Sequence, residues 1–334
     1  MIYRVLCVKE ESKMAFADIP VSTQTFTVRS NIQHIELQKF YDELKPMGPA
    51  PQVSGPMCKR EATILCIKYQ QQKKGYDPEK DQKSKRKRKE QESTKRNFLN
   101  CITLIIQVEK RINIKIFKNG VFQLTGCKEI DNVRRCLKLI LSELDKTNKA
   151  NDPSSYFTLQ EGYESFIIYI KSAMRNIDFD LGFKVNRSIL SKRLTCLYKE
   201  DDNVIIPDAI GNKMDVKIKI RVTRENLEHL PITKITNPIN DKPKEEIVLY
   251  KDCLHIIEPD KKKLESKMKD KFVSISVFQN GKVLLSAMDA SIQEQYYEWF
   301  TELIGSIEVD IKPQILPKKT FLIGKSRQKM KLNI

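Results

Sequence analysis

The sequence of 334 residues lacks the features of a membrane or disulfide-bonded protein. No apolar run approaches the roughly 20 residues needed to cross a bilayer. The N-terminus, MIYRVLCVKEE, is too short and too soon acidic for a secretory signal, so we expect an intracellular protein. The eight cysteines are scattered without a CxxC pair, and several lie in apolar runs, where free cysteine acts as a small hydrophobe. This usage favours a reducing compartment over a disulfide framework.

The signatures of catalysis and of metal binding are also scarce. The three histidines, His34, His229 and His255, lie neither in an HExxH motif nor beside an obvious Cys or Ser nucleophile. The phosphate-binding patterns GxxxxGK[ST] and GxGxxG are absent. Cys253 with His255 comes nearest to a metal site, but two further ligands at useful spacing are missing. We therefore predict a protein that is not an enzyme and that has no cofactor or metal.

Most of the net charge of +17 lies in two segments. Residues 73–96 contain eleven Lys/Arg and five Asp/Glu, and residues 312–334 contain seven Lys/Arg and no acid. The run KSKRKRK (Lys83 to Lys89) is typical of a solvated, disordered loop, and it also fits nucleic-acid binding or nuclear import. A polyanionic partner fits this charge, because each neutralised phosphate releases counterions.

The most informative feature is an internal repeat without gaps. The segment INIKIFKNGVFQLTGCK (Ile112–Lys128) aligns with VSISVFQNGKVLLSAMD (Val273–Asp289). An Asn-Gly turn lies at the same place in both copies, which predicts a β-hairpin in each. Phe117 matches Phe278, and Thr125 matches Ser286.

The surroundings of the two hairpins repeat as well. Apolar residues at helical spacing follow each hairpin, and a strand and a shorter helix precede each at a distance. In the second half the strand around Asn176–Val185 leads to Asn186, a good N-cap. Each half therefore predicts strand, helix, several antiparallel strands and a long helix, a duplicated α+β unit. We expect an N-terminal extension (1–20), a first repeat (21–150), a second repeat (151–310) and a basic tail (311–334). The first repeat contains a basic insertion at about 71–97. The second contains an insertion at about 224–270, which includes a strand at Glu246–Leu254.

Alternation along each hairpin separates two faces. Ile112, Ile114 and Ile116 share one face, and Lys115 and Phe117 share the other. A lone aromatic among polar residues ordinarily packs under a loop or a neighbouring strand. Its duplication instead favours a pair of wedges that unstack base steps in the DNA minor groove.

These hairpins resemble a known family. IFKNGVFQLTGCK and VFQNGKVLLSAM resemble the repeated signature of the TATA-box-binding proteins (TBPs), and NFLNCITLIIQVEKRINIKIFKNG resembles the TBP-like proteins of large nucleocytoplasmic DNA viruses. The resemblance covers both hairpins and their following helices and extends weakly over the rest. It implies an α+β saddle, in which two pseudosymmetric repeats form one curved antiparallel sheet with helices on the convex face and DNA on the concave face.

The resemblance also implies which residues contact DNA. Phe117 and Phe278 match one wedge of each repeat, Thr125 and Ser286 match threonines that touch bases, and Asn176 matches the second repeat's central asparagine. The first repeat's asparagine position falls near Thr23 or Gln24, where no asparagine stands. We expect Gln24, Lys115, Gln123 and Leu284 to face DNA as well.

The partner wedges are less well defined. Met214 is the candidate in the second half and Phe98 in the first, but a competing alignment places Arg60–Tyr69 on that strand and leaves no phenylalanine. Lys115 and Gln123 stand where the family has aliphatic residues, and Ser286-Ala287 replaces threonine-glycine. These departures weaken the expectation of a strict TATA preference, because minor-groove readout is degenerate and depends on shape.

Two functions follow from the resemblance. The first is a transcription initiation factor that binds and bends AT-rich promoter DNA and recruits IIB-type general transcription factors and RNA polymerase machinery, in the host nucleus or a cytoplasmic viral factory. Its partner surfaces would be the helices near 131–145 and 289–304 and the insertions, although charges such as Arg134, Arg135 and Lys138 also fit a merely solvated helix face. The alternative is a scaffold or architectural protein that kept the saddle and lost TATA specificity. Either is compatible with a heteromeric assembly.

Overall fold

The computed structural model describes residues 15–48, 61–77, 100–146, 155–199, 201, 203–205, 214–257 and 271–313. Most of the basic insertion, nearly all of the basic tail and the candidate Phe98 lie outside these ranges. No helix within the described ranges combines the length and apolarity needed to cross a bilayer.

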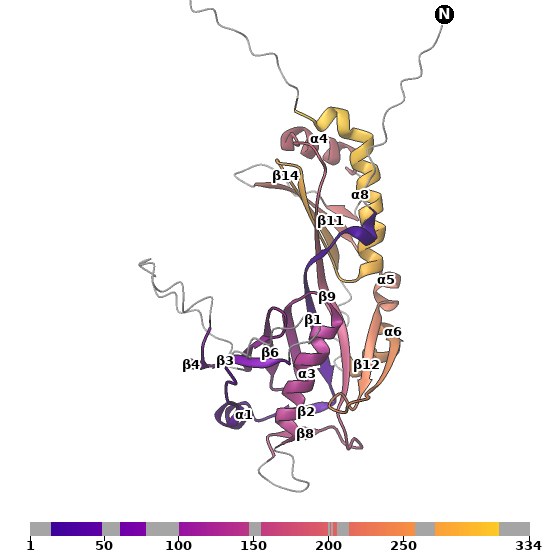
Figure 1. Cartoon of the computed structure of the whole chain (residues 1–334). Helices are drawn as coiled ribbons and strands as arrows, with labels where there is room; N and C mark the ends of the chain where they lie inside the picture. Colours follow the sequence, from indigo (N-terminus) through magenta and orange to yellow (C-terminus); the bar gives the residue numbers. More distant parts are fainter. Residues whose placement is uncertain are drawn as a thin grey trace, which may run out of the picture.

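The core of the molecule is one antiparallel sheet of 13 strands (Figure 1). The long strands β1 (Val21–Ser30) and β9 (Ile167–Asp180) pair at its centre. Beyond β1 the order is β7 (Val121–Cys127), β6 (Arg111–Phe117), β5 (Cys101–Gln107), β3 (Thr63–Tyr69) and β4 (Gln72–Gly75). Beyond β9 it is β15 (Lys282–Ala287), β14 (Phe272–Phe278), β11 (Asp215–Arg221) and β10 (Val204–Ile205). The α+β class and the single large antiparallel sheet are thus confirmed, and the same strand order extends to both sides of the central pair.

The register relates the two halves residue by residue. Across β1 and β7, Thr25 lies opposite Thr125, and across β9 and β15, Asn176 lies opposite Ser286. Since β1 and β9 are antiparallel neighbours, Thr25 and Asn176 hold equivalent positions in the two halves. The matched hairpins of the sequence therefore occupy matched places in the sheet.

Helices cover one face of this sheet. In Figure 1, α8 (Ala290–Ile311) lies along the upper half and α3 (Ile130–Asp145) crosses the lower half. The aliphatic face of β6 packs with α3 in one core, and that of β14 packs with α8 in a second. Two shorter helices, α1 (Leu37–Glu43) and α4 (Arg187–Leu197), bury their apolar residues in the same two cores. The predicted N-cap is confirmed, because the side chain of Asn186 accepts a hydrogen bond from the backbone N–H of Ile189.

The repeated Asn-Gly turn has a steric reason in each half. Gly120 has φ +70° and Gly281 has φ +89°, in the left-handed region that favours glycine. A Cβ on Gly120 would lie 2.4 Å from the carbonyl oxygen of Ile32, and one on Gly281 would lie 2.1 Å from that of Phe183. In both halves the chain leaving the central strand passes directly against the hairpin turn.

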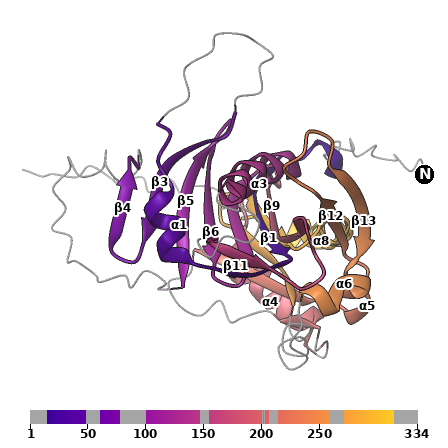
Figure 2. The ribbon, with the colours of Figure 1, turned by 90° about the horizontal axis from the view of Figure 1, so that it is seen from below.

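The insertion of the second half adds a subdomain beside the central strands. It contains α5 (Arg224–Glu228), β12 (Pro231–Thr236), β13 (Lys244–Leu249) and α6 (Tyr250–Ile257). The expected strand at Glu246–Leu254 therefore ends at Leu249, where the α6 helix takes over. β12 pairs with Ile167–Ile170 of β9, and Figure 2 shows these elements on the opposite side of α3 from β3, β5 and β6. The remaining described elements are η1 (Phe16–Asp18), β2 (Ile32–Ile35) and β8 (Phe157–Leu159), of which the last two pair with each other.

Candidate nucleic-acid interface

We call the sheet face opposite α3 and α8 the open face. Strand alternation directs the polar residues of both hairpins to it, away from the two cores. In the first half it carries Thr25 and Thr27 of β1, Gln123 and Thr125 of β7, and Asn113, Lys115 and Phe117 of β6. In the second half it carries Asn176 and Asp178 of β9, Leu284 and Ser286 of β15, Ser274, Ser276 and Phe278 of β14, and Lys217 and Lys219 of β11.

Phe117 and Phe278 stand at equivalent places on this face. Each is the last residue of its strand, directly before the turn, and each is partly exposed. Phe117 lies opposite Cys101 and Phe278 lies opposite Asp215. Neither ring belongs to the buried clusters that pack against the helices. Two aromatic rings are thus available on the open face, one toward the outer part of each half.

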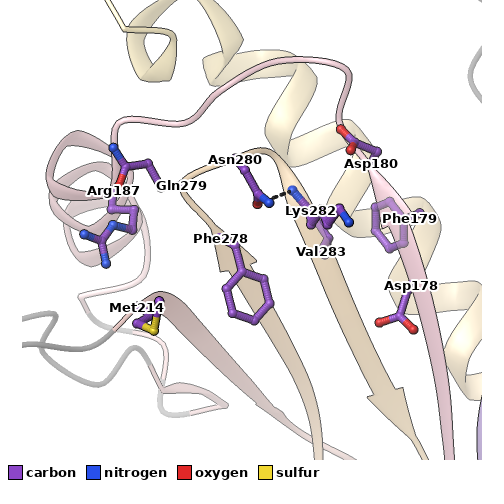
Figure 3. Close-up of a pocket in the computed structure, with 10 residues that line it drawn as sticks. All are labelled: Asp178, Phe179, Asp180, Arg187, Met214, Phe278, Gln279, Asn280, Lys282 and Val283. Carbon is purple, nitrogen blue, oxygen red and sulfur yellow. Dashed lines mark hydrogen bonds between the residues drawn. The ribbon is translucent and has the colours of Figure 1, made fainter.

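A pocket adjoins Phe278 (Figure 3). Its cavity of about 1080 Å³ is lined by residues from β9, β14 and β15 and by Met214, which directly precedes β11. The Met214 side chain is 79% exposed, and so it can contact a ligand of the open face together with Phe278. The rim carries both signs of charge, from Asp178, Asp180, Arg187 and Lys282.

The first-half counterpart of Met214 falls before β5. Cys101 lies opposite Phe117 as Asp215 lies opposite Phe278, so β5 holds the place of β11. The competing segment Arg60–Tyr69 instead contributes β3, one strand further out. Phe98, two residues before the described part of this segment, lies outside the described residues.

Small polar groups occupy the middle of the open face. The hydroxyl of Thr125 donates to the carbonyl of Asn113 at 3.4 Å, and Ser286 lies opposite Asn176. The side-chain oxygen Oδ1 of Asn176 is shielded from solvent and has no hydrogen-bond partner in the described part of the chain. A shielded acceptor without a partner costs free energy.

Gln24 does not lie on the open face, which corrects its prediction as a contact residue. Gln24 lies opposite the buried Cys127, and its amide donates to the hydroxyl of Ser172 at 2.9 Å. The cause is alternation within β1, because Gln24 shares its side of the strand with Phe26 and Val28, which lie in the core. A bulge at Gly126 of β7, where φ is +92°, shifts the β1–β7 register by one residue at this point. Thr25 therefore takes the position equivalent to Asn176. Alternating threonines at 23, 25 and 27 were the signal in the sequence.

The other predicted residues lie on the open face. Lys115 lies between Thr103 and Gln123, and Gln123 also lies opposite Thr27. In the second half Leu284 lies between Ser276 and Asp178. The open face is therefore lined mainly by polar side chains, with a few apolar ones among them.

The basic residues of α3 are engaged within the chain. Arg134 pairs with Glu245 of β13 at 2.7 Å, and Lys138 pairs with Asp241 at 3.0 Å. Arg135 pairs with Glu109. The insertion of the second half thus covers part of the helix surface that the resemblance assigned to partners.

Within the described ranges, no group of three or more His, Cys, Asp or Glu side chains is placed to hold a metal ion. Burial raises the pKa of the Cys127 thiol to about 12 and that of the Cys253 thiol to about 11. Such thiols stay protonated and unreactive near neutral pH.

Comparison with known proteins agrees with the resemblance of the hairpins. No protein-family model matches the chain. The chain is 27% identical over 227 residues to "Uncharacterized protein 335L" of Invertebrate iridescent virus 6, covering 66% of this chain and 64% of that protein. It is 32% identical over 114 residues to a "TATA-box-binding protein-like" protein of Acanthamoeba polyphaga mimivirus, covering 32% of this chain and 31% of that protein. The chain thus matches less than two thirds of the length of either relative.

Among solved structures, a Methanococcus jannaschii TBP aligns with 87% of this chain and 98% of its own, at 13% identity and a TM-score of 0.38. A score this low supports no functional inference. The sequence similarity to the mimivirus protein stands independently of this score, and it extends over about a third of the chain.

Proposed function

We propose that the open face binds duplex DNA through the minor groove and bends it. The observation that carries the proposal is the placement of Phe117 and Phe278, two partly exposed rings at equivalent ends of one sheet and outside both cores. Apolar side chains at the ends of such a surface can enter base steps and kink the duplex. The kink costs a few kcal/mol per step, which is offset when the bent duplex contacts more of the sheet.

The middle of the face suits the floor of the groove. The partly exposed Thr125 and Ser286 offer hydroxyls, and Asn176 offers an amide. Adenine N3 and thymine O2 accept hydrogen bonds there. Lysines of the outer strand β11, Lys217 and Lys219, would neutralise phosphates and make the affinity depend on salt.

The test is a fluorescence anisotropy titration of a labelled AT-rich duplex at two salt concentrations, with energy transfer between the duplex ends to report bending. We expect the Phe117→Ala/Phe278→Ala double variant to bind at least about tenfold more weakly, since a base–aromatic contact contributes about 1–3 kcal/mol. The variant should also lose most of the bend. Val309→Ala is the matched control, because Val309 of α8 is 90% exposed on the helix side.

Two outcomes would decide against the proposal in different ways. If the double variant binds and bends DNA as the wild type does, wedge insertion is wrong. If neither protein binds duplex DNA, the scaffold function is favoured instead.

Transcription initiation extends the same proposal. A bent promoter complex would present the helices and the insertion to IIB-type factors and to RNA polymerase machinery. In an electrophoretic mobility shift assay, a purified IIB-type factor should retard the complex of wild-type protein and DNA further, and it should have no effect on DNA alone. Absence of the retarded species would separate DNA binding from recruitment.

A further inference from the structure

The two halves of the open face differ in chemistry at equivalent positions. The pairs Thr25–Thr125 and Asn176–Ser286 fix the equivalence. Two residues further along the strands, Gln123 lies opposite Thr27 in the first half. At the same place in the second half, Leu284 lies opposite Asp178.

The difference continues onto the next strand. Lys115 lies beside Gln123 in the first half, whereas Ser276 lies beside Leu284 in the second. In the second half the next residue along this line of cross-strand neighbours is Lys217 of β11, opposite Ser276. Lys217 is therefore one strand further from the central strands β1 and β9 than Lys115 of β6 is. Near the centre, the first half therefore presents an ammonium and an amide, and the second half presents a carboxylate.

Asp178 is well placed to act as an acceptor. Its side chain is exposed, and it shares the pocket of Figure 3 with Phe278 and Met214. In the described part of the chain, no hydrogen bond or ion pair engages its carboxylate. A carboxylate on a surface that binds DNA is repelled by phosphates, so its presence calls for a donor on the ligand.

The minor groove supplies such a donor at one kind of base pair. A·T and T·A pairs present only acceptors there, whereas a G·C pair adds the guanine N2 amine. Ammonium and amide groups of Lys115 and Gln123 complement the acceptors of A·T. The Asp178 carboxylate complements the guanine amine and is repelled by the acceptors of A·T.

We propose, on the basis of the DNA binding proposed above, that Asp178 selects a G·C pair under the second half while Lys115 and Gln123 select A·T pairs under the first. The preferred site is then asymmetric, and the protein binds it in one orientation. The polar residues that depart from the aliphatic pattern of TBPs thereby become determinants of specificity.

Three sets of duplexes test the proposal by anisotropy titration. The first set has a core of A·T pairs only. In the second set a single G·C pair replaces one A·T pair, and its position is moved step by step through one half of the core. In the third set G·C pairs occupy both the same position and its symmetry-related position in the other half. Because the protein can bind either way round, it can place a single G·C pair under Asp178. At one of the scanned positions, the duplex with a single G·C pair should bind about fivefold more tightly than the duplex with the A·T-only core. The duplex with two G·C pairs should lose this gain in affinity, because one of its G·C pairs must then face Lys115.

Two variants exchange the residues of the halves. Asp178→Thr, which installs the residue that Thr27 provides in the first half, should abolish the gain from a single G·C pair. Lys115→Ser, which copies Ser276, should restore tight binding of the doubly substituted duplex. Asp145→Thr, at the end of α3, removes the same charge away from the open face and should change none of these ratios.

The outcomes separate the two proposals. If wild type binds all three sets equally well, or if Asp178→Thr keeps the preference for a single G·C pair, the asymmetric readout is wrong and DNA binding stands. If no duplex binds at any salt concentration used, the proposed function itself fails.

Discussion

Arg134 of α3 and Glu245 of β13 form an ion pair of 2.7 Å between residues 111 positions apart in the chain. Lys138 of α3 and Asp241, in the turn between β12 and β13, form a second ion pair at 3.0 Å. The insertion of the second half is thereby fixed against the helix of the first half. The α3 helix and the insertion were both expected as partner surfaces. Because they lie against each other, a partner that approached α3 would also meet the insertion.

Reversal of one charge should loosen this contact. In Arg134→Glu two carboxylates would face each other, and we expect an insertion that is cleaved faster in limited proteolysis, with a loss of about 0.2–1 kcal/mol in the free energy of unfolding. The double variant Arg134→Glu/Glu245→Arg should regain most of the protection. Equal cleavage rates for the wild type and the single variant would contradict a fixed insertion.

Glycine should be required at the second hairpin turn. In Gly281→Ala the new Cβ would lie 2.1 Å from the carbonyl oxygen of Phe183, in a left-handed backbone conformation. We expect a loss of at least about 1 kcal/mol in urea unfolding. Gly305→Ala is the control, because nothing lies within 4 Å of that Cβ in the middle of α8, and it should stabilise by about 0.5–1 kcal/mol. A Gly281→Ala protein as stable as the wild type would show that the turn can shift.

Thiol reactivity should single out Cys196. Among the cysteines in the described ranges, Cys196 is exposed and the others are buried, with the pKa of Cys127 raised to about 12 by burial. In a Cys7→Ser/Cys58→Ser background, we expect one thiol per chain to react rapidly with iodoacetamide and the rest to react only in denaturant. Peptide mapping by mass spectrometry identifies the labelled site, and rapid labelling of Cys127 or Cys136 would contradict the packing of α3 on the sheet.

Acid should weaken the start of α3. Desolvation raises the pKa of Glu109, but the hydrogen bond and charge of Arg135 outweigh it and the net pKa is lowered. Because the folded-state pKa lies below the unfolded one, this stabilisation is present above the unfolded pKa and is lost as pH falls through the folded pKa. The carboxylate also accepts from Asn132 at 3.0 Å. At neutral pH the Glu109→Gln variant should have a lower Tm than the wild type. In acid the Tm difference between the two proteins should shrink. A Tm difference that stays the same at all pH values would exclude this linkage.

The sequence was sufficient for the features that depend on local pattern. Alternation in the two hairpins assigned Ile114 to the core face and Phe117 to the opposite face, because side chains alternate strictly in an unbroken strand. The Asn-Gly turns and the cap at Asn186 follow from backbone preferences of single residues. Repetition of these patterns indicated the duplicated α+β arrangement.

Only the tertiary structure decided which residues meet across the sheet. The pairing of β1 with β7 places Thr25 opposite Thr125, and the bulge at Gly126 shifts the register by one residue so that Gln24 lies opposite the buried Cys127. The contact of Glu245 with Arg134 and the contrast between Asp178 and Thr27 likewise join positions far apart in the chain. Such pairings depend on the docking of whole strands and helices, which local sequence preferences do not encode.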